Sequence, residues 1–173
     1  MKTQTAHRLS AILLAGLLVV GCSKSVKSED SAYGAQFRKM TEEQTKDVTD
    51  FNHKSWAATQ EIRADGKVKP ETLAALKNVL ESKKAHYASF SSVKASEMFA
   101  EFHTITTDFM KQKLDLDTEQ YGLFESAEER QLNRMTDKLE KIGLEYTKKL
   151  KACMEKVDKT YFDLAMKSQD EFR

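Results

Sequence analysis

The sequence has few of the residues that turn or cross-link a chain. Its 173 residues include one proline, six glycines and two cysteines. A β-sandwich or barrel needs turn residues between many short strands, so this composition argues against both. The 28 Lys and Arg nearly balance the 27 Asp and Glu, which removes the electrostatic basis for nucleic-acid binding. The content of 40% hydrophobic and 32% charged residues is typical of a folded, soluble domain.

No apolar run of the sequence is long enough to form a membrane-spanning helix. The longest run covers residues 11–20 and follows the basic residues Lys2 and Arg8. A spanning helix needs about 20 apolar residues. A short apolar run after a basic start is typical of a secretory signal peptide, which we predict over residues 1–21.

A cysteine follows the predicted signal peptide. Residues 19–21, Val-Val-Gly, stand directly before Cys22. This segment resembles the lipobox of bacterial lipoproteins, which places an aliphatic and a small residue before an invariant cysteine. The resemblance covers residues 1–22 and implies cleavage before Cys22 and a thioether link from Cys22 to diacylglycerol. Ser23 follows instead of aspartate, which by analogy with enteric sorting implies a lipid anchor in the outer membrane and a domain facing the periplasm.

Beyond the cysteine, the sequence predicts a linker and one helical domain. Residues 22–35 are small and polar and show no periodicity, so we expect a flexible linker. In the domain, residues 36–173, apolar side chains recur every three or four positions, which is the spacing of one helix face. We predict three long helices, over 36–64, 70–114 and 126–172.

The helix lengths predict an elongated antiparallel three-helix bundle of coiled-coil character. The last helix has the clearest near-heptad pattern. Residues 116–125 are expected to be the connector before it, and residues 126–129 have the spacing of a capping box. Residues 89–92 contain three serines, which are poor helix formers, so a break there would give a four-helix bundle instead.

The sequence contains no common signature of catalysis. It has no nucleophile-elbow, phosphate-binding, zinc-protease or dinucleotide-binding motif. A long bundle offers extended surfaces rather than the concave pocket that small-molecule chemistry uses. We therefore expect no enzymatic activity and no cofactor, but a scaffold or assembly accessory that binds an envelope protein. Trp56 and Phe99 lie off the clearest apolar stripes, which makes them candidates for the partner surface.

The predicted register also allows a metal-binding alternative. Antiparallel pairing would place His53, His86 and Cys153 near one level of the bundle. Two imidazoles and a thiolate suit zinc or copper. If Cys22 carries lipid, Cys153 has no partner within the chain, so it is buried, reactive or paired between chains. Cys153 also fits as a small core residue, and no metal site is assigned.

Two short segments suggest a further alternative. Residues 40–44, Met-Thr-Glu-Glu-Gln, and 116–120, Leu-Asp-Thr-Glu-Gln, look like loose versions of the LTxxQ pattern that occurs twice in Spy-like periplasmic chaperones. The resemblance implies a small all-helical holdase, here tethered to a membrane. Met40 replaces the pattern's leucine and Asp117 replaces its threonine. The same spacing is also that of a helix capping box.

Overall fold

The computed structural model describes residues 26–167. They form five α-helices and one short 3-10 helix: α1 (Ser28–Asp65), α2 (Pro70–Ser91), η1 (Glu97–Phe99), α3 (Ala100–Glu125), α4 (Glu129–Met154) and α5 (Lys159–Met166). The predicted all-α class is confirmed, because these residues contain no strand. None of the described helices is long and apolar enough to cross a bilayer. The predicted signal peptide and Cys22 lie outside the described residues.

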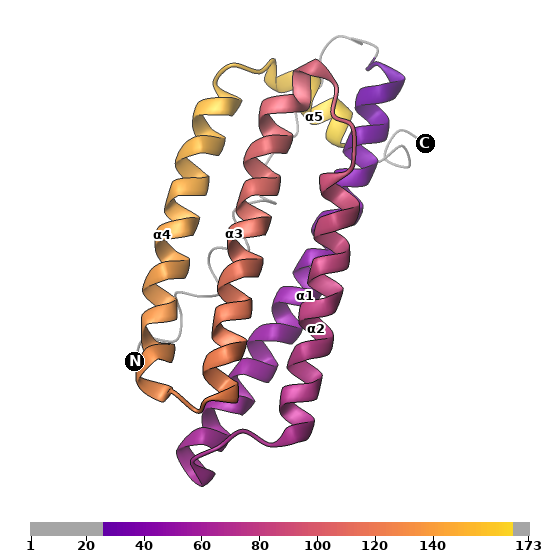
Figure 1. The fold of residues 1–173 in the computed structure, drawn as a ribbon. Coiled ribbons are helices and arrows are strands. Elements are labelled where there is room, and N and C mark those ends of the chain that lie inside the picture. Colours follow the sequence, from indigo (N-terminus) through magenta and orange to yellow (C-terminus); the bar gives the residue numbers. More distant parts are fainter. Residues whose placement is uncertain (1–25, 168–173) are drawn as a thin grey trace.

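The four long helices lie side by side, and successive helices run in opposite directions (Figure 1). The ion pairs that join α3 to α4 follow this direction. Lys138 of α4 pairs with Glu119, and Lys156, two residues after the end of α4, pairs with Glu101, so residue numbers rise along one helix as they fall along the other. The most extensive contacts join successive long helices, and α5 returns to pack on α1.

The single helix expected over 70–114 is in fact two helices, so the three-helix count was wrong. α2 ends at Ser91, and α3 begins at Ala100 and runs back along α2. At the break, the hydroxyls of Ser91 and Ser92 donate to the carbonyls of Ala88 and Ser89, at 3.2 and 2.8 Å. The alternative with a break near residues 89–92 therefore describes the chain better.

α1 begins earlier than the sequence indicated. Residues 28–35, which were expected to belong to the linker, are helical, and Tyr33 and Gly34 are buried. The Tyr33 ring stacks on Phe99 with ring centroids 5.0 Å apart. The same ring also lies near Phe90 and His103, so aromatic contacts hold this otherwise small and polar segment on the bundle.

The turn between α3 and α4 lies later than predicted. Residues 116–125, expected to be a connector, are helical, and the chain turns at residues 126–128, where Ala127 has a φ of 55°. Ser126 donates to the carbonyl of Gly122 at 3.0 Å, so its hydroxyl caps the end of α3 rather than the start of α4. The expected connector contributes three side chains to the core: Leu116, Leu123 and Phe124.

The last predicted helix, 126–172, is also interrupted. α4 ends at Met154, and α5 begins at Lys159 with the Asp158 carboxylate accepting from the Tyr161 backbone N–H at 3.2 Å. The apolar pattern continues across this turn because α5 has its own apolar face, which packs mainly on α1, while Phe162 also contacts Phe102 of α3.

The buried side chains form two clusters. The first surrounds Phe51 and Leu76, and the second is rich in aromatic residues from the end of the bundle where α1 begins. The buried members of the second cluster are Tyr33, Met40, Phe90, Phe99, Phe102, Met110, Cys153 and Ala165.

Helix α5 is fixed to α1 by polar contacts at both of its ends. Asp30, which is 2% exposed, accepts hydrogen bonds from the hydroxyls of Ser96 and Tyr161, the latter at 2.6 Å. Arg38 donates to the carbonyls of Met166 and Lys167 at 2.6 and 2.8 Å. These two bonds satisfy carbonyls at the end of α5 that have no partner within the helix.

Candidate functional site

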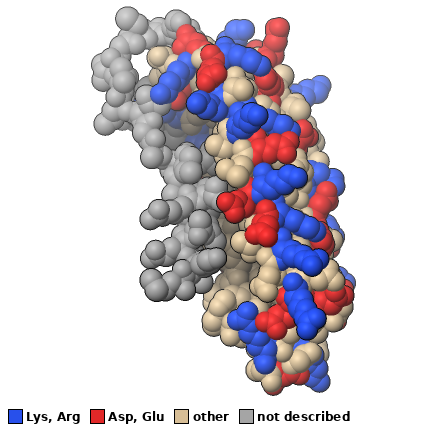
Figure 2. Space-filling model, turned by 90° about the vertical axis from the view of Figure 1, so that its left-hand side faces the viewer, with Lys and Arg blue, Asp and Glu red and all other residues tan. Residues whose placement is uncertain are grey.

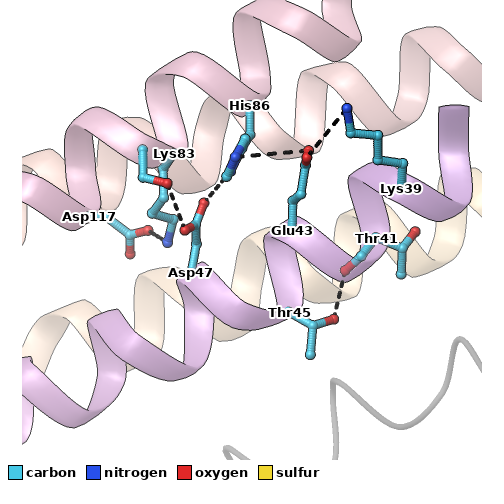
Figure 3. Close-up of polar contacts among 9 residues, drawn as sticks. Lys39, Thr41, Glu43, Thr45, Asp47, Lys83, His86 and Asp117 are labelled. Carbon is cyan, nitrogen blue, oxygen red and sulfur yellow. Dashed lines mark hydrogen bonds and ion pairs between the residues drawn. The ribbon is translucent and has the colours of Figure 1, made fainter.

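The least expected feature of the bundle is a group of polar side chains between its two apolar clusters. We call this group the polar layer. α1 contributes Asp47, which lies between Met40 and Phe51, and α2 contributes Lys83, which lies between Leu80 and Phe90. The complete layer consists of Asp47, Ser82, Lys83, His86, Lys113 and Asp117, from α1, α2 and α3. Figure 3 labels four of them: Asp47, Lys83, His86 and Asp117.

One half of the layer is a buried ion pair. Lys83 donates to Asp117, and both side chains are less than 10% exposed. The Lys83 ammonium also lies 4.9 Å from the centre of the Phe51 ring, which adds a cation–π contact. A second ammonium, of Lys113, lies 3.8 Å from Asp117. Burial lowers the pKa of Lys113, Asp117 opposes this shift, and the like charge of Lys83 adds to it.

The other half of the layer centres on His86. Its Nδ1 lies 2.6 Å from the Asp47 carboxylate, and its Nε2 lies 3.9 Å from Glu43. The Ser82 hydroxyl donates to the other oxygen of Asp47 at 3.0 Å. Figure 3 shows Asp47 between the imidazole and the Lys83–Asp117 pair. The carboxylate of Asp47 therefore fixes both the rotamer and the tautomer of His86.

An oriented histidine is one component of acid–base catalysis, but this layer supplies no nucleophile for it. Ser82 donates to Asp47 and not to a ring nitrogen of His86. Nucleophilic catalysis needs the hydroxyl or thiol to bond to its base. The arrangement instead joins three helices at fixed positions, because each charged group has its partner on a different helix or one turn away.

A shallow depression with a volume of about 10 Å³, the room of about one water molecule, lies between α3 and α4. Its lining includes Phe109 and Tyr146, whose rings stack with centroids 4.2 Å apart. Two aromatic rings in contact leave little room for a ligand between them.

The three residues considered for a metal site are not brought together. His53 is exposed, His86 is held by Asp47, and Cys153 is buried in the aromatic cluster. Among residues 26–167, no group of three or more His, Cys, Asp or Glu side chains is arranged to hold a metal. Burial, with a smaller effect of Glu101, also raises the pKa of the Cys153 thiol, which disfavours the thiolate that a metal would need.

The two candidates for a partner surface have opposite environments. Trp56 is 65% exposed on α1. Phe99 is 0% exposed, and its ring contacts Tyr33 and Phe162. The assignment of Phe99 to a surface was therefore wrong: it lies off the helical stripes because η1 turns it inward.

The two segments that resemble the chaperone pattern both lie inside helices, 40–44 in α1 and 116–120 in α3. Neither caps a helix start. Their acidic residues take part in the contacts already described, with Glu43 beside His86 and Asp117 paired with Lys83.

The polar layer was missed although the sequence carries a signal for it. The apolar stripe of α2 steps from Leu80 directly to Tyr87, and Lys83 fills the missing position at helical spacing. A lysine inside an apolar stripe predicts a buried charge, which in turn requires a buried carboxylate.

No protein-family model matches the chain, and neither curated proteins nor solved structures include a significant match.

Proposed function

We propose that the protein is a lipid-anchored scaffold or assembly accessory of the bacterial outer membrane that binds an envelope protein and carries out no catalysis. The lipobox-like segment ending at Cys22 supports the anchor. Because α1 begins at Ser28, residues 23–27 alone separate Cys22 from the bundle, a reach of at most about 18 Å. The tether thus holds the bundle close to the membrane.

The exposure of Trp56 carries the proposal of binding. Tryptophan buries a large apolar area on association and is enriched among the residues that dominate binding energy. Here the only tryptophan of the chain is 65% exposed in the C-terminal third of α1, the longest of the described helices.

The charged surface contributes less to the proposal. On the side of the molecule where α4 lies, positive and negative side chains alternate without an extended field of one sign (Figure 2). Such a surface favours solubility over the attraction of a highly charged partner.

A photo-reactive amino acid in place of Trp56, in the full-length protein at native expression, tests the proposal. We expect irradiation to yield one or two discrete products in which this chain is cross-linked to a different envelope protein. The matched control is the same replacement at Leu144, which is 64% exposed on α4. A broad ladder of unrelated products would support a holdase chaperone instead. Products no stronger than those from position 144 would contradict the proposal.

A further inference from the structure

One face of α1 carries no charge over more than four turns. Its residues, which we call the neutral stripe, are Thr45, Thr49, Asn52, Trp56 and Gln60. Steps of three and four place them on one side of the helix, over a length of about 22 Å. Gln60 is partly exposed and the other four are exposed. Since 32% of the chain is charged, an exposed stripe of this length without charge indicates a surface that another surface covers.

The hydroxyl groups of the two threonines in the stripe have hydrogen-bond acceptors within α1. Thr45 donates its hydroxyl hydrogen to the carbonyl of Thr41 at 2.8 Å, and Thr49 donates to that of Thr45 at 2.9 Å. Figure 3 shows Thr45 on the side of α1 away from Asp47 and His86. Because these donors are satisfied within the helix, removing them from water costs little.

We infer that the neutral stripe pairs with the neutral stripe of a second copy of this chain, with the two α1 helices parallel. In a parallel two-fold contact each residue meets its own counterpart, so a charged residue would always face the same charge. A charge-free stripe avoids this repulsion. The amides of Asn52 and Gln60 have both donors and acceptors and can bond to an identical group, while the two Trp56 side chains supply the buried apolar area.

The parallel direction rests on the lipid anchor of the proposed function. With a tether as short as residues 23–27, the α1 helices of two anchored copies start at the same membrane surface. Confinement to one membrane also raises the effective concentration of each copy for the other. A contact smaller than a typical stable interface is then sufficient.

Cysteine substitutions at two positions of the stripe test this pairing. We expect Thr49→Cys and Gln60→Cys, each expressed alone as the full-length lipidated protein, to give a disulfide-linked product of twice the chain mass after mild oxidation in the cell envelope. Asn78→Cys on α2 and Asn133→Cys on α4 are exposed controls that should remain monomeric. Products that form only when the 49 and 60 variants are mixed would indicate antiparallel pairing and overturn the inference, as would the absence of any product.

A charge at the centre of the stripe provides a second test. Asn52→Asp would bring two carboxylates together, and we expect at least a tenfold lower yield of the Gln60→Cys product, partly restored by high salt. Asn78→Asp makes the same change outside the stripe and should leave the yield unchanged. An unchanged yield with Asn52→Asp, in a variant whose circular dichroism is native, would overturn the pairing.

Separate measurements test the lipid anchor and the pairing of the two stripes. Labelling of Cys22 with a clickable fatty acid reports the anchor. Lipidated protein without cross-links at positions 49 and 60 overturns the pairing alone. In that case, a product between position 56 and a different envelope protein still supports the proposed function. Disulfides at positions 49 and 60 together with position-56 products that contain only this chain would support the pairing and contradict the binding of an envelope protein through Trp56. Unlipidated protein overturns the anchor, and with it the reason for parallel pairing.

Discussion

Gly34 and Ala165 bring the backbones of α1 and α5 into direct contact. A Cβ atom built on Gly34 would lie 2.0 Å from the Ala165 carbonyl oxygen. Since the obstacle is backbone, no side-chain rotation can relieve it. Glycine is required here for close approach, and its left-handed freedom is not used.

Gly34→Ala is therefore expected to displace α5, with a loss of about 1–3 kcal/mol in the free energy of unfolding, as for other overpacked sites. Hydrogen exchange should show faster exchange of the α5 amides, while those of α2 and α3 keep their protection. Gly122→Ala is the matched control. Nothing lies within 4 Å of a Cβ built there, so replacing a helical glycine should stabilise the protein by about 0.5–1 kcal/mol. Protection of α5 unchanged by Gly34→Ala would contradict the close contact.

The buried ion pair predicts a large effect of a small change. Asp117→Asn removes the carboxylate from the buried ammonium of Lys83 and from the partly buried ammonium of Lys113, and should cost about 3–5 kcal/mol in urea unfolding. Asp115→Asn, two residues away, breaks the exposed pair with Lys111 and should scarcely change stability. Equal unfolding midpoints for the two variants would show that Asp117 does not neutralise a buried charge.

His103 predicts a pH dependence of stability. It lies 3.3 Å from the Tyr33 hydroxyl and packs on the Phe90 ring, and burial lowers its pKa. The unfolded chain therefore takes up a proton more readily than the folded one. The contribution of His103 is complete above the ordinary histidine pKa of 6.5 and falls as the pH drops below it.

Urea midpoints at pH 7.5 and pH 5.5 measure this dependence. His103→Phe should lose less stability on acidification than the wild type, because it cannot take up the proton. His53→Gln changes an exposed histidine and should behave as the wild type does. A pH dependence that His103→Phe leaves unchanged would assign the effect to another group.

Cys153 should report the docking of α5. The thiol is 2% exposed in the same apolar cluster as Phe162 and Ala165, and its pKa is raised chiefly by burial. We expect slow reaction with Ellman's reagent at pH 8 in the native protein and no disulfide between chains. Phe162→Ala removes ring contacts with Phe99 and Phe102 and should accelerate the reaction at least tenfold. Leu144→Ala, on an exposed site, should not. Rapid reaction of the wild type would contradict the burial.

Periodicity predicted the helices better than it predicted their ends. The stripes through Leu76 and Leu132 lie on α2 and α4 as expected, since spacing alone determines which side of a helix is apolar. The turn after Met154 could not be predicted, because the apolar pattern runs through it. What changes at the turn is the helix that is mainly packed against, which is α3 for α4 and α1 for α5. The start of α1 depends on Tyr33 meeting Phe99, a contact between distant positions that no local pattern contains.

For the candidate functional residues, too, periodicity predicted some properties and not others. The exposure of Trp56 followed from its place off the apolar stripe, and the same argument was wrong for Phe99 because η1 is not an α-helix. To predict the partners of His86, one would need the relative position of α1 and α2 to within one helical turn, which sequence periodicity does not provide.

The order of contacts along the chain has a consequence for how the protein folds. Among the described helices, α1 packs on α2, α2 on α3 and α3 on α4, so these contacts close only short loops and form rapidly. The contact of α1 with α5 joins the most distant described segments, because Asp30 and Tyr161 are 131 positions apart. A chain that emerges with its N-terminus first can therefore assemble its hairpins one after another. Asp30 at the start of α1 therefore gains its hydrogen bond from Tyr161 only after α5 has been made.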